Sequence, residues 1–312
     1  MKHSMQNTLF HFKTNLNGIK PHNANEIQGV HPDNKDCVLD FRELVYEKTL
    51  DLNISILEKV FKDVKRIYAG SSFCPNYFLH CSIFHRLIDY CRANNIKISL
   101  SICIFPQSLV TAGMQALQQL LSYGDGIIDE LVVNDIGMLR YATTNIKIKT
   151  VLGRLFFKDP RDGRFPNFIG RRTTFSLLSH RDLFEEWHPF GIEIDPISDL
   201  IDLSRLNGLL GLVALNSPFC YMSCGNLCRA ASVFKPLNQK FRPSAPCALE
   251  CLETASIHSD KFRKESRSLF VVGKTVYFYN PSAQVICPPK ITLRRLYFPL
   301  GEFIKRLQMQ CQ

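Results

Sequence analysis

The sequence predicts an α/β fold built on a (β/α) barrel-like parallel sheet, complete or incomplete, with a small β-hairpin appendage near the C-terminus. From about residue 51, short β-rich runs alternate with helical segments, which is typical of parallel strands joined by crossover helices. Six or more such units follow one another within about 170 residues, which suits a barrel. No GxGxxG motif opens a helix after the first strand, which argues against an open dinucleotide-binding sheet.

The expected strands are short runs of apolar and β-branched residues. They cover residues 66–70, 97–105, 130–134, 147–157, 191–195 and 208–215. Pro106 ends the second run, because proline cannot donate a hydrogen bond to a central strand.

Helices are expected over residues 77–93, 108–123 and 180–187. In the first, Leu79, Ile83 and Leu87 recur at helical spacing. In the second, Ser108 is the expected N-cap and Gly124 follows the last helical residue.

These elements divide the chain into three expected parts. Residues 1–50 form a polar N-terminal extension, residues 51–255 the barrel-like domain, and residues 256–312 a basic C-terminal appendage. Residues 268–280 predict a hairpin that turns at Gly273. A hairpin fits poorly between parallel barrel strands, so we assign it to the appendage.

Composition places the chain among ordinary globular proteins, with 46% hydrophobic and 21% charged residues in 312. The longest weakly polar stretch, residues 206–219, contains two asparagines and is shorter than the roughly 20 apolar residues that span a bilayer. Residues 1–18 contain no apolar h-region, so no signal peptide is expected. These features predict a cytoplasmic protein without a membrane span.

The net charge of +10 is concentrated in two places. Residues 261–312 carry ten Lys or Arg and two Glu, and residues 154–172 carry six basic and two acidic residues. Such patches can neutralise phosphates, so RNA or another polyanion is a candidate partner. A basic surface that only keeps the protein soluble is the alternative.

Five of the twelve cysteines form a dense group. They are Cys220, Cys224, Cys228, Cys247 and Cys251, with the spacing C-x3-C-x3-C-x18-C-x3-C. In a cytoplasmic chain, clustered cysteines bind a metal more often than they form disulfides. Residues four apart on a helix share one face, so each pair could direct two thiolates at one point, which suits zinc or an iron–sulfur cluster.

A sixth cysteine, Cys74, follows the first expected strand, just as Cys220 follows the last. In a parallel barrel both positions lie at the carboxyl ends of the strands, where sites are built from the βα loops. Residues about 150 apart in the sequence can therefore converge on one metal centre.

Several short motifs make the chain resemble a known family. In order, they are 67–70 (IYAG) followed by Cys74, 133–137 (VNDIG), 153–161 (with GRL and DPR), Cys228 followed by Cys247 and Cys251, and the hairpin at 269–279. Their order and spacing resemble the collagenase-like peptidase family U-thirty-two, closest to its short iron–sulfur members, the UbiU- and UbiV-like proteins of anaerobic hydroxylation. The resemblance covers roughly residues 55–285.

The resemblance implies a 4Fe-4S cluster held by Cys74, Cys228, Cys247 and Cys251. Cys220 and Cys224 are additions to the family pattern, and either could replace Cys228 as a ligand. The short members take part in oxygen-independent hydroxylation of a quinone precursor or an RNA base. They act in pairs, so a hetero-oligomer with a related iron–sulfur protein is also implied.

Charged residues at strand ends are candidate substrate-binding groups. Glu193 and Asp195 are two residues apart on one expected strand, so they face the same side. Asp135 ends another strand, and Arg154 and Arg161 could bind an anionic substrate. Salt-bridged or solvent-facing roles are the alternatives for the three acidic residues, and a solvated surface is the alternative for the two arginines.

Two other functions stay open at this point. A collagenase-like peptidase would match the family name, but the sequence shows no nucleophile or zinc-protease motif. A non-catalytic RNA- or protein-binding module, stabilised by zinc or by the cluster, would match the basic C-terminal segment.

Overall fold

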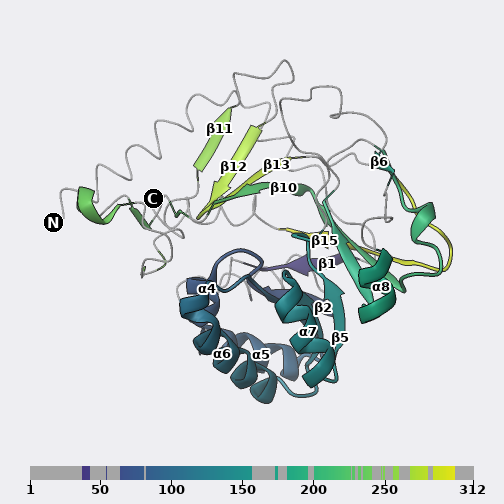
Figure 1. Ribbon diagram of the computed structural model, residues 1–312, viewed down its shortest axis with the longest axis horizontal. Helices are drawn as coiled ribbons and strands as arrows, with labels where there is room; N and C mark the ends of the chain where they lie inside the picture. Colours follow the sequence, from purple (N-terminus) through teal and green to yellow (C-terminus); the bar gives the residue numbers. More distant parts are fainter. Residues whose placement is uncertain are drawn as a thin grey trace.

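The computed structural model shows a closed β-barrel with a second sheet beside it (Figure 1). The structure describes residues 37–42, 54, 64–80, 82–156, 173–174, 181–195, 200–225, 227–228, 231–232, 235–240, 247, 249, 256–259, 268–279 and 284–298. Everything below refers to these residues.

The barrel contains eight strands, all parallel, and each is hydrogen-bonded to two neighbours. In order around the barrel they are β1 (Cys37–Asp40), β15 (Thr292–Tyr297), β9 (Leu212–Ser217), β7 (Gly191–Ile194), β5 (Lys149–Leu152), β4 (Ile128–Val133), β3 (Lys97–Ile102) and β2 (Arg66–Gly70). The expected barrel-like α/β class is therefore confirmed, and the barrel is complete.

Two barrel strands lie outside the range 51–255 in which the barrel was expected. Strand β1 pairs with β2 on one side and with β15 on the other, where Cys37 faces Arg295 and Leu39 faces Tyr297. Strand β15 also pairs with β9 over its whole length. Segments near both ends of the chain thus close the barrel.

Helices cover one side of the barrel (Figure 1). They are α4 (Pro75–Leu79), α5 (Ser82–Ala93), α6 (Val110–Tyr123), α7 (Ile136–Asn145) and α8 (Arg181–Trp187). The helix expected over residues 77–93 is divided, because the backbone leaves the helical conformation at His80. The helix expected from Ser108 begins after a 3₁₀ turn, η1 (Gln107–Leu109), so Ser108 is not its N-cap, whereas Gly124 is its C-cap.

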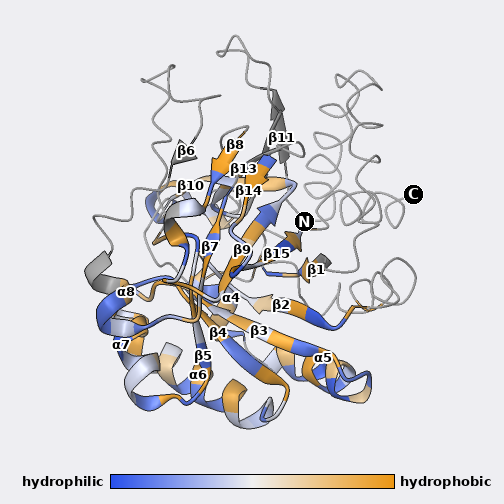
Figure 2. Cartoon of the chain, turned by 90° about the vertical axis from the view of Figure 1, so that its right-hand side faces the viewer, coloured by the Kyte–Doolittle hydropathy of each residue, from blue (hydrophilic) through white to orange (hydrophobic). Residues whose placement is uncertain are grey.

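Hydrophobic residues fill the space on both sides of the barrel wall. A large core lies between the strands and the helices, and a separate cluster fills the barrel interior. The interior cluster consists of Val38, Tyr68, Val132, Val151, Leu212, Ala214 and Leu296. Figure 2 shows the hydrophobic strands and the mixed surfaces of the helices around them. Alternate residues of each strand point inward, which is the usual way such a barrel is filled.

A second, antiparallel sheet is inserted between β9 and β15. Its strand order is β10 (Phe219–Cys224), β13 (Thr275–Tyr279), β12 (Ser268–Val272) and β11 (Ser256–Ser259). Strands β12 and β13 pair over the residues where a hairpin was expected, with Gly273 in the left-handed region at φ 60°. The chain then returns to the barrel through β15.

Three short strands form a further parallel sheet, in the order β14 (Gln284–Ile286), β8 (Leu200–Asp202) and β6 (Thr173–Thr174). Two more 3₁₀ turns are η3 (Ser204–Leu206) and η4 (Leu237–Gln239). Over the described residues, every helix is too short or too polar to cross a membrane.

Candidate functional site

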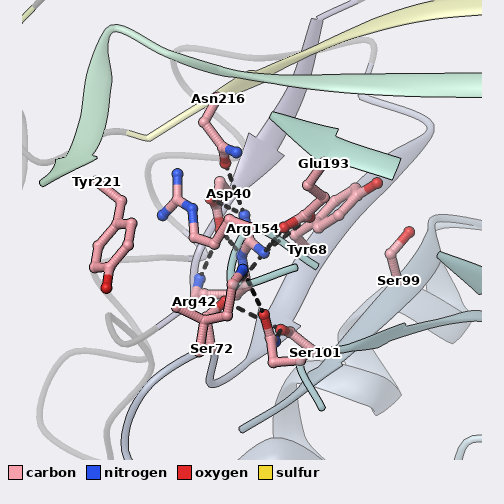
Figure 3. A network of polar contacts seen from close by, with 12 residues as sticks. Asp40, Arg42, Tyr68, Ser72, Ser99, Ser101, Arg154, Glu193, Asn216 and Tyr221 are labelled. Atoms are coloured by element: carbon pink, nitrogen blue, oxygen red, sulfur yellow. Dashed lines mark hydrogen bonds and ion pairs between the residues drawn. The ribbon is translucent and has the colours of Figure 1, made fainter. Parts of the chain in front are cut away.

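A buried network of charged and polar side chains centred on Arg42 lies at the carboxyl end of the barrel (Figure 3). Arg42 follows β1, and its guanidinium binds Asp40 through Nε (2.8 Å) and Nη2 (2.6 Å). Its Nη1 donates to both carboxylate oxygens of Glu193 on β7, at 2.9 and 2.8 Å. The guanidinium therefore joins two carboxylates from strands β1 and β7.

Two neutral side chains complete the shell of this guanidinium. Ser72, after β2, accepts from Nη1 at 3.2 Å, and Asn216 on β9 accepts from Nη2 at 3.0 Å. An arginine has five N–H donors, and these contacts engage all of them. Arg42 is only 1% exposed, so this full pairing is what allows its charge to be buried.

A second buried ion pair lies beside the first. Arg154, in the loop after β5, donates from Nη2 to Asp195 Oδ1 at 2.8 Å. The same oxygen accepts from the backbone N–H of Tyr221 on β10, at 2.7 Å. The guanidinium also lies over the rings of Phe73 and Tyr277, 5.8 and 5.9 Å from their centroids. This pair therefore attaches the second sheet to the barrel.

Aromatic side chains cover the networks from the side of the second sheet. The ring of Phe73, in the loop after β2, stacks on Tyr221 with the ring centroids 4.8 Å apart. It packs edge-on against Tyr277, with the centroids 6.4 Å apart. Tyr277 also contacts Phe298, which follows β15, at 5.4 Å. Strands β10 and β13 thus lie against the carboxyl end of the barrel. Their side chains shield the Arg42 and Arg154 networks from solvent, which explains why these charges are buried.

The loop that follows β2 connects this network to the first expected cluster ligand. Ser71 Oγ accepts from the backbone N–H groups of Phe73 (3.2 Å) and Cys74 (2.8 Å). Ser72 Oγ lies 3.1 Å from Ser101 Oγ and also contacts Arg42. Cys74 is the N-cap residue of α4. Hydrogen bonds therefore hold residues 71–74 in place, from the end of β2 to the Cys74 thiol.

A second expected ligand contacts α4, the helix that begins directly after Cys74. Cys247 Sγ accepts from the side-chain amide of Asn76, two residues after Cys74, at 3.6 Å. Cys74, Cys224 and Cys247 are all half-buried and pack against the main core. Cys247 thus contacts a residue that lies two positions after Cys74 in the chain.

The remaining cysteines of the group differ in burial and in position along the chain. Cys228 is half-buried, and its Sγ accepts from the backbone N–H of Ala231 at 3.5 Å. Cys220 is fully buried on β10, and Cys224 ends that strand. Cys251 lies outside the described residues.

The thiols suit a cluster in chemical type. Thiolates are the ligands of 4Fe-4S clusters, and side-chain amides commonly donate to ligand sulfurs. Among the described residues, no three His, Cys, Asp or Glu side chains are arranged as a metal site. Cys74, Cys228 and Cys247 are among those residues and do not form such a group, and Cys251 lies outside the described residues.

The expected substrate-binding residues have different positions. Glu193 and Asp195 both face the carboxyl end of the barrel, where each binds an arginine. Arg154 is paired and 4% exposed, so its charge faces a carboxylate rather than solvent. Asp135 is the N-cap of α7, with Oδ1 accepting from Met138 N at 2.9 Å. Arg161 lies outside the described residues.

Sequence reasoning missed the centre of the site. Asp40 and Arg42 lie in the segment that was expected to be a polar extension. A short signal was present, because the polar residues Asp40 and Arg42 alternate with the apolar residues Leu39 and Phe41, and such alternation indicates a strand.

The amino end of the barrel carries another network of arginines and carboxylates. Arg294 on β15 binds both oxygens of Glu130 on β4, at 2.6 and 3.0 Å, and donates to Tyr68 Oη at 2.9 Å. Arg66 binds both oxygens of Asp129, at 2.5 and 2.7 Å, and lies 3.4 Å from Glu130. This network is partly open, since both arginine side chains are 15% exposed.

Comparisons with protein-family models, with curated proteins and with solved structures gave no match. The resemblance to the collagenase-like peptidase family therefore rests on the motifs in the sequence.

Proposed function

We propose that this chain is a 4Fe-4S protein of oxygen-independent hydroxylation, with the cluster held by Cys74, Cys228, Cys247 and Cys251 at the carboxyl end of the barrel. The contact between Asn76 and Cys247 carries the proposal, because it joins two expected ligand segments 171 residues apart in the sequence. The carboxyl end of a (β/α) barrel is also where active sites of this fold lie.

The bound cluster would transfer electrons, which is the chemistry that such a group adds to a barrel. The chain's own residues would fix the first thiolate and adjust its surroundings. Ser71 holds the backbone N–H of Cys74, and Ser72 connects the same loop to Arg42. The Asn76 amide would donate to the Cys247 thiolate. By the resemblance, the substrate would be a quinone precursor or an RNA base.

Anaerobic purification of the full chain, followed by iron and sulfide analysis and absorption spectroscopy, tests the proposal. We expect about four iron and four sulfide per chain and a broad visible absorbance. Cys74→Ser and Cys247→Ser should each lose most of the iron. Stoichiometric zinc without visible absorbance would contradict the cluster and favour a structural metal.

Cys287→Ser is a matched control, because Cys287 is also half-buried but donates to the backbone oxygens of Pro288 and Ile291. It should keep its iron. Serine variants of Cys220, Cys224 and Cys228 then identify the remaining ligand, which we expect to be Cys228. Peptide cleavage that persists in Cys74→Ser would favour the peptidase instead.

Removal of the Asn76 amide gives a smaller and more specific effect. A hydrogen bond to a cluster sulfur stabilises the reduced, more negative state. A hydrogen bond worth about 1 kcal/mol corresponds to about 40 mV for one electron. Asn76→Leu should therefore keep its iron and lower the reduction potential by about that amount, as measured by redox titration. An unchanged potential would show that this amide does not contact the cluster.

A further inference from the structure

Two carboxylates share one guanidinium inside the barrel, and they share it unequally. Asp40 binds two nitrogens of Arg42 through both oxygens and also accepts from the backbone N–H of Arg42 at 3.1 Å. Glu193 binds only Nη1, which it also shares with Ser72. Since the other N–H groups of Arg42 have partners of their own, Asp40 is much better stabilised as an anion than Glu193.

The charges around Glu193 do not balance. Arg42, Asp40 and Arg154 face this carboxyl group from the segments after β1, within β1 and after β5, and Tyr68 faces it from β2. The neighbouring strand β9 contributes the neutral Asn216, and Asp195, directly after β7, already binds Arg154. If all were ionised, three carboxylates would face two guanidiniums.

All five of these charged groups are nearly or fully buried, with side chains at most 4% exposed. An uncompensated charge in such surroundings is costly, and a buried carboxyl group usually avoids the cost by taking up a proton. Two separate donors, Arg154 Nη2 and the Tyr221 N–H, bind Asp195 Oδ1, whereas a single nitrogen, Arg42 Nη1, binds Glu193.

We infer that Glu193 is a neutral carboxylic acid at neutral pH and stores one exchangeable proton inside the barrel, beside the site at its carboxyl end. The proton makes the group of five charged side chains neutral as a whole. A positive charge that arrives at this end of the barrel favours release of the proton, and a negative charge favours its retention. The site can thus give or accept a proton whenever the charge beside it changes.

The direction of the pKa shift agrees with the geometry. Burial raises the pKa of Glu193, the charges of Arg42 and Arg154 and the hydrogen bond from Arg42 oppose the rise, and the charge of Asp40 adds to it. In the unfolded chain the pKa is about 4.3. The folded state therefore binds the proton more tightly, and stability falls as the pH rises from about 4.3 through the folded pKa.

Infrared difference spectroscopy of the full chain tests the inference directly. The wild-type protein at pH 7 should show the C=O band of a protonated carboxyl group, which shifts in deuterium oxide. The band should disappear in Glu193→Gln and remain in Glu130→Gln, a matched change at the other end of the barrel. Absence of the band from the folded wild-type protein would overturn the inference, whatever the variants do.

Thermal unfolding provides an independent test. Glutamine resembles a protonated glutamate, so Glu193→Gln should change Tm by less than about 3 °C at pH 7. It should also remove the decrease in stability as the pH rises. Asp40→Asn, which removes the better-paired anion, should lower Tm several times more. Equal losses in Glu193→Gln and Asp40→Asn would contradict a neutral Glu193.

Discussion

The two ends of the barrel interior use the same kinds of residue and reach opposite electrostatic results. At the amino end, Arg66 and Arg294 face Asp129 and Glu130, so two cations balance two anions. At the carboxyl end, two arginines face three carboxylates, and the whole group is buried. A balanced, partly exposed network serves stability, whereas a buried group with more carboxyl groups than arginines shifts the pKa of one carboxyl, and such shifts are typical of functional sites.

Two glutamates show the difference most clearly. At the amino end, burial alone would raise the pKa of Glu130, but the hydrogen bond and charge of Arg294 and the charge of Arg66 lower it overall. At the carboxyl end, burial is complete, and the pKa of Glu193 stays raised despite Arg42. The same side chain is thus held ionised at one end and pushed toward the neutral form at the other.

The largest expected effect comes from removing the central cation of each network. Arg42→Gln leaves Asp40 and Glu193 together in the interior, and breaking such a pair costs about 3–5 kcal/mol. Arg294→Gln should cost about 1–3 kcal/mol, because Arg66 remains 3.4 Å from Glu130. Urea unfolding of both variants measures the difference. Equal losses would mean that the two ends do not differ in their dependence on one cation.

A smaller effect is expected when each glutamate is neutralised. Glu130→Gln removes a charged partner of Arg294 and should cost about 1.5–3 kcal/mol at pH 7, whereas Glu193→Gln should cost little. The comparison uses one substitution at two sites, so it isolates the surroundings. A larger loss in Glu193→Gln than in Glu130→Gln would reverse our assignment of the two ends.

The Glu130 contribution also depends on pH. Its folded pKa is lowered, so its contribution is present above the unfolded value of about 4.3 and is lost as the pH falls through the folded pKa. The stability gap between the wild type and Glu130→Gln should therefore narrow below about pH 4. A gap that stays constant with pH would show that the pKa of Glu130 is not lowered by folding.

The smallest expected effect distinguishes two serines. Ser72 accepts from Arg42 at the carboxyl end, and Ser99 accepts from Arg66 and donates to Glu130 at the amino end. Each alanine variant should lose about 0.5–1.5 kcal/mol. Only Ser72→Ala should also lower the iron content, because Ser72 lies in the loop that positions Cys74. Equal iron content in both variants would show that the Arg42 network does not influence the loop that positions Cys74.

Much of the barrel could be predicted because its middle strands are apolar and regularly spaced. The run at residues 66–70 became β2 with the expected bounds, and residues 191–195 include β7. Strands β1 and β15 were harder, because charged residues interrupt their short apolar runs: Asp40 ends β1, and Arg294 and Arg295 stand in the middle of β15. From the sequence alone, a charged residue that faces the barrel interior cannot be distinguished from a solvent-exposed one until the neighbouring strands are known.

The same reason limits what the sequence says about the site. Glu193 and Asp195 were recognised because they are two residues apart at the end of a strand. Their partner Arg42 lies 151 residues away from Glu193. Only barrel closure brings these side chains together, so spacing along the chain contains no sign of the contact.

Closure of the barrel by β1 and β15 has a consequence for how the protein folds. Residues 37–39 must find residues 295–297, a pairing between distant parts of the chain. Such contacts form slowly, because a long loop must be ordered first. Until then β2 and β9 are open edges that can pair with other chains. Aggregation during refolding is therefore the expected competitor of native folding, and a chain shortened before β15 should be recovered mainly as aggregate.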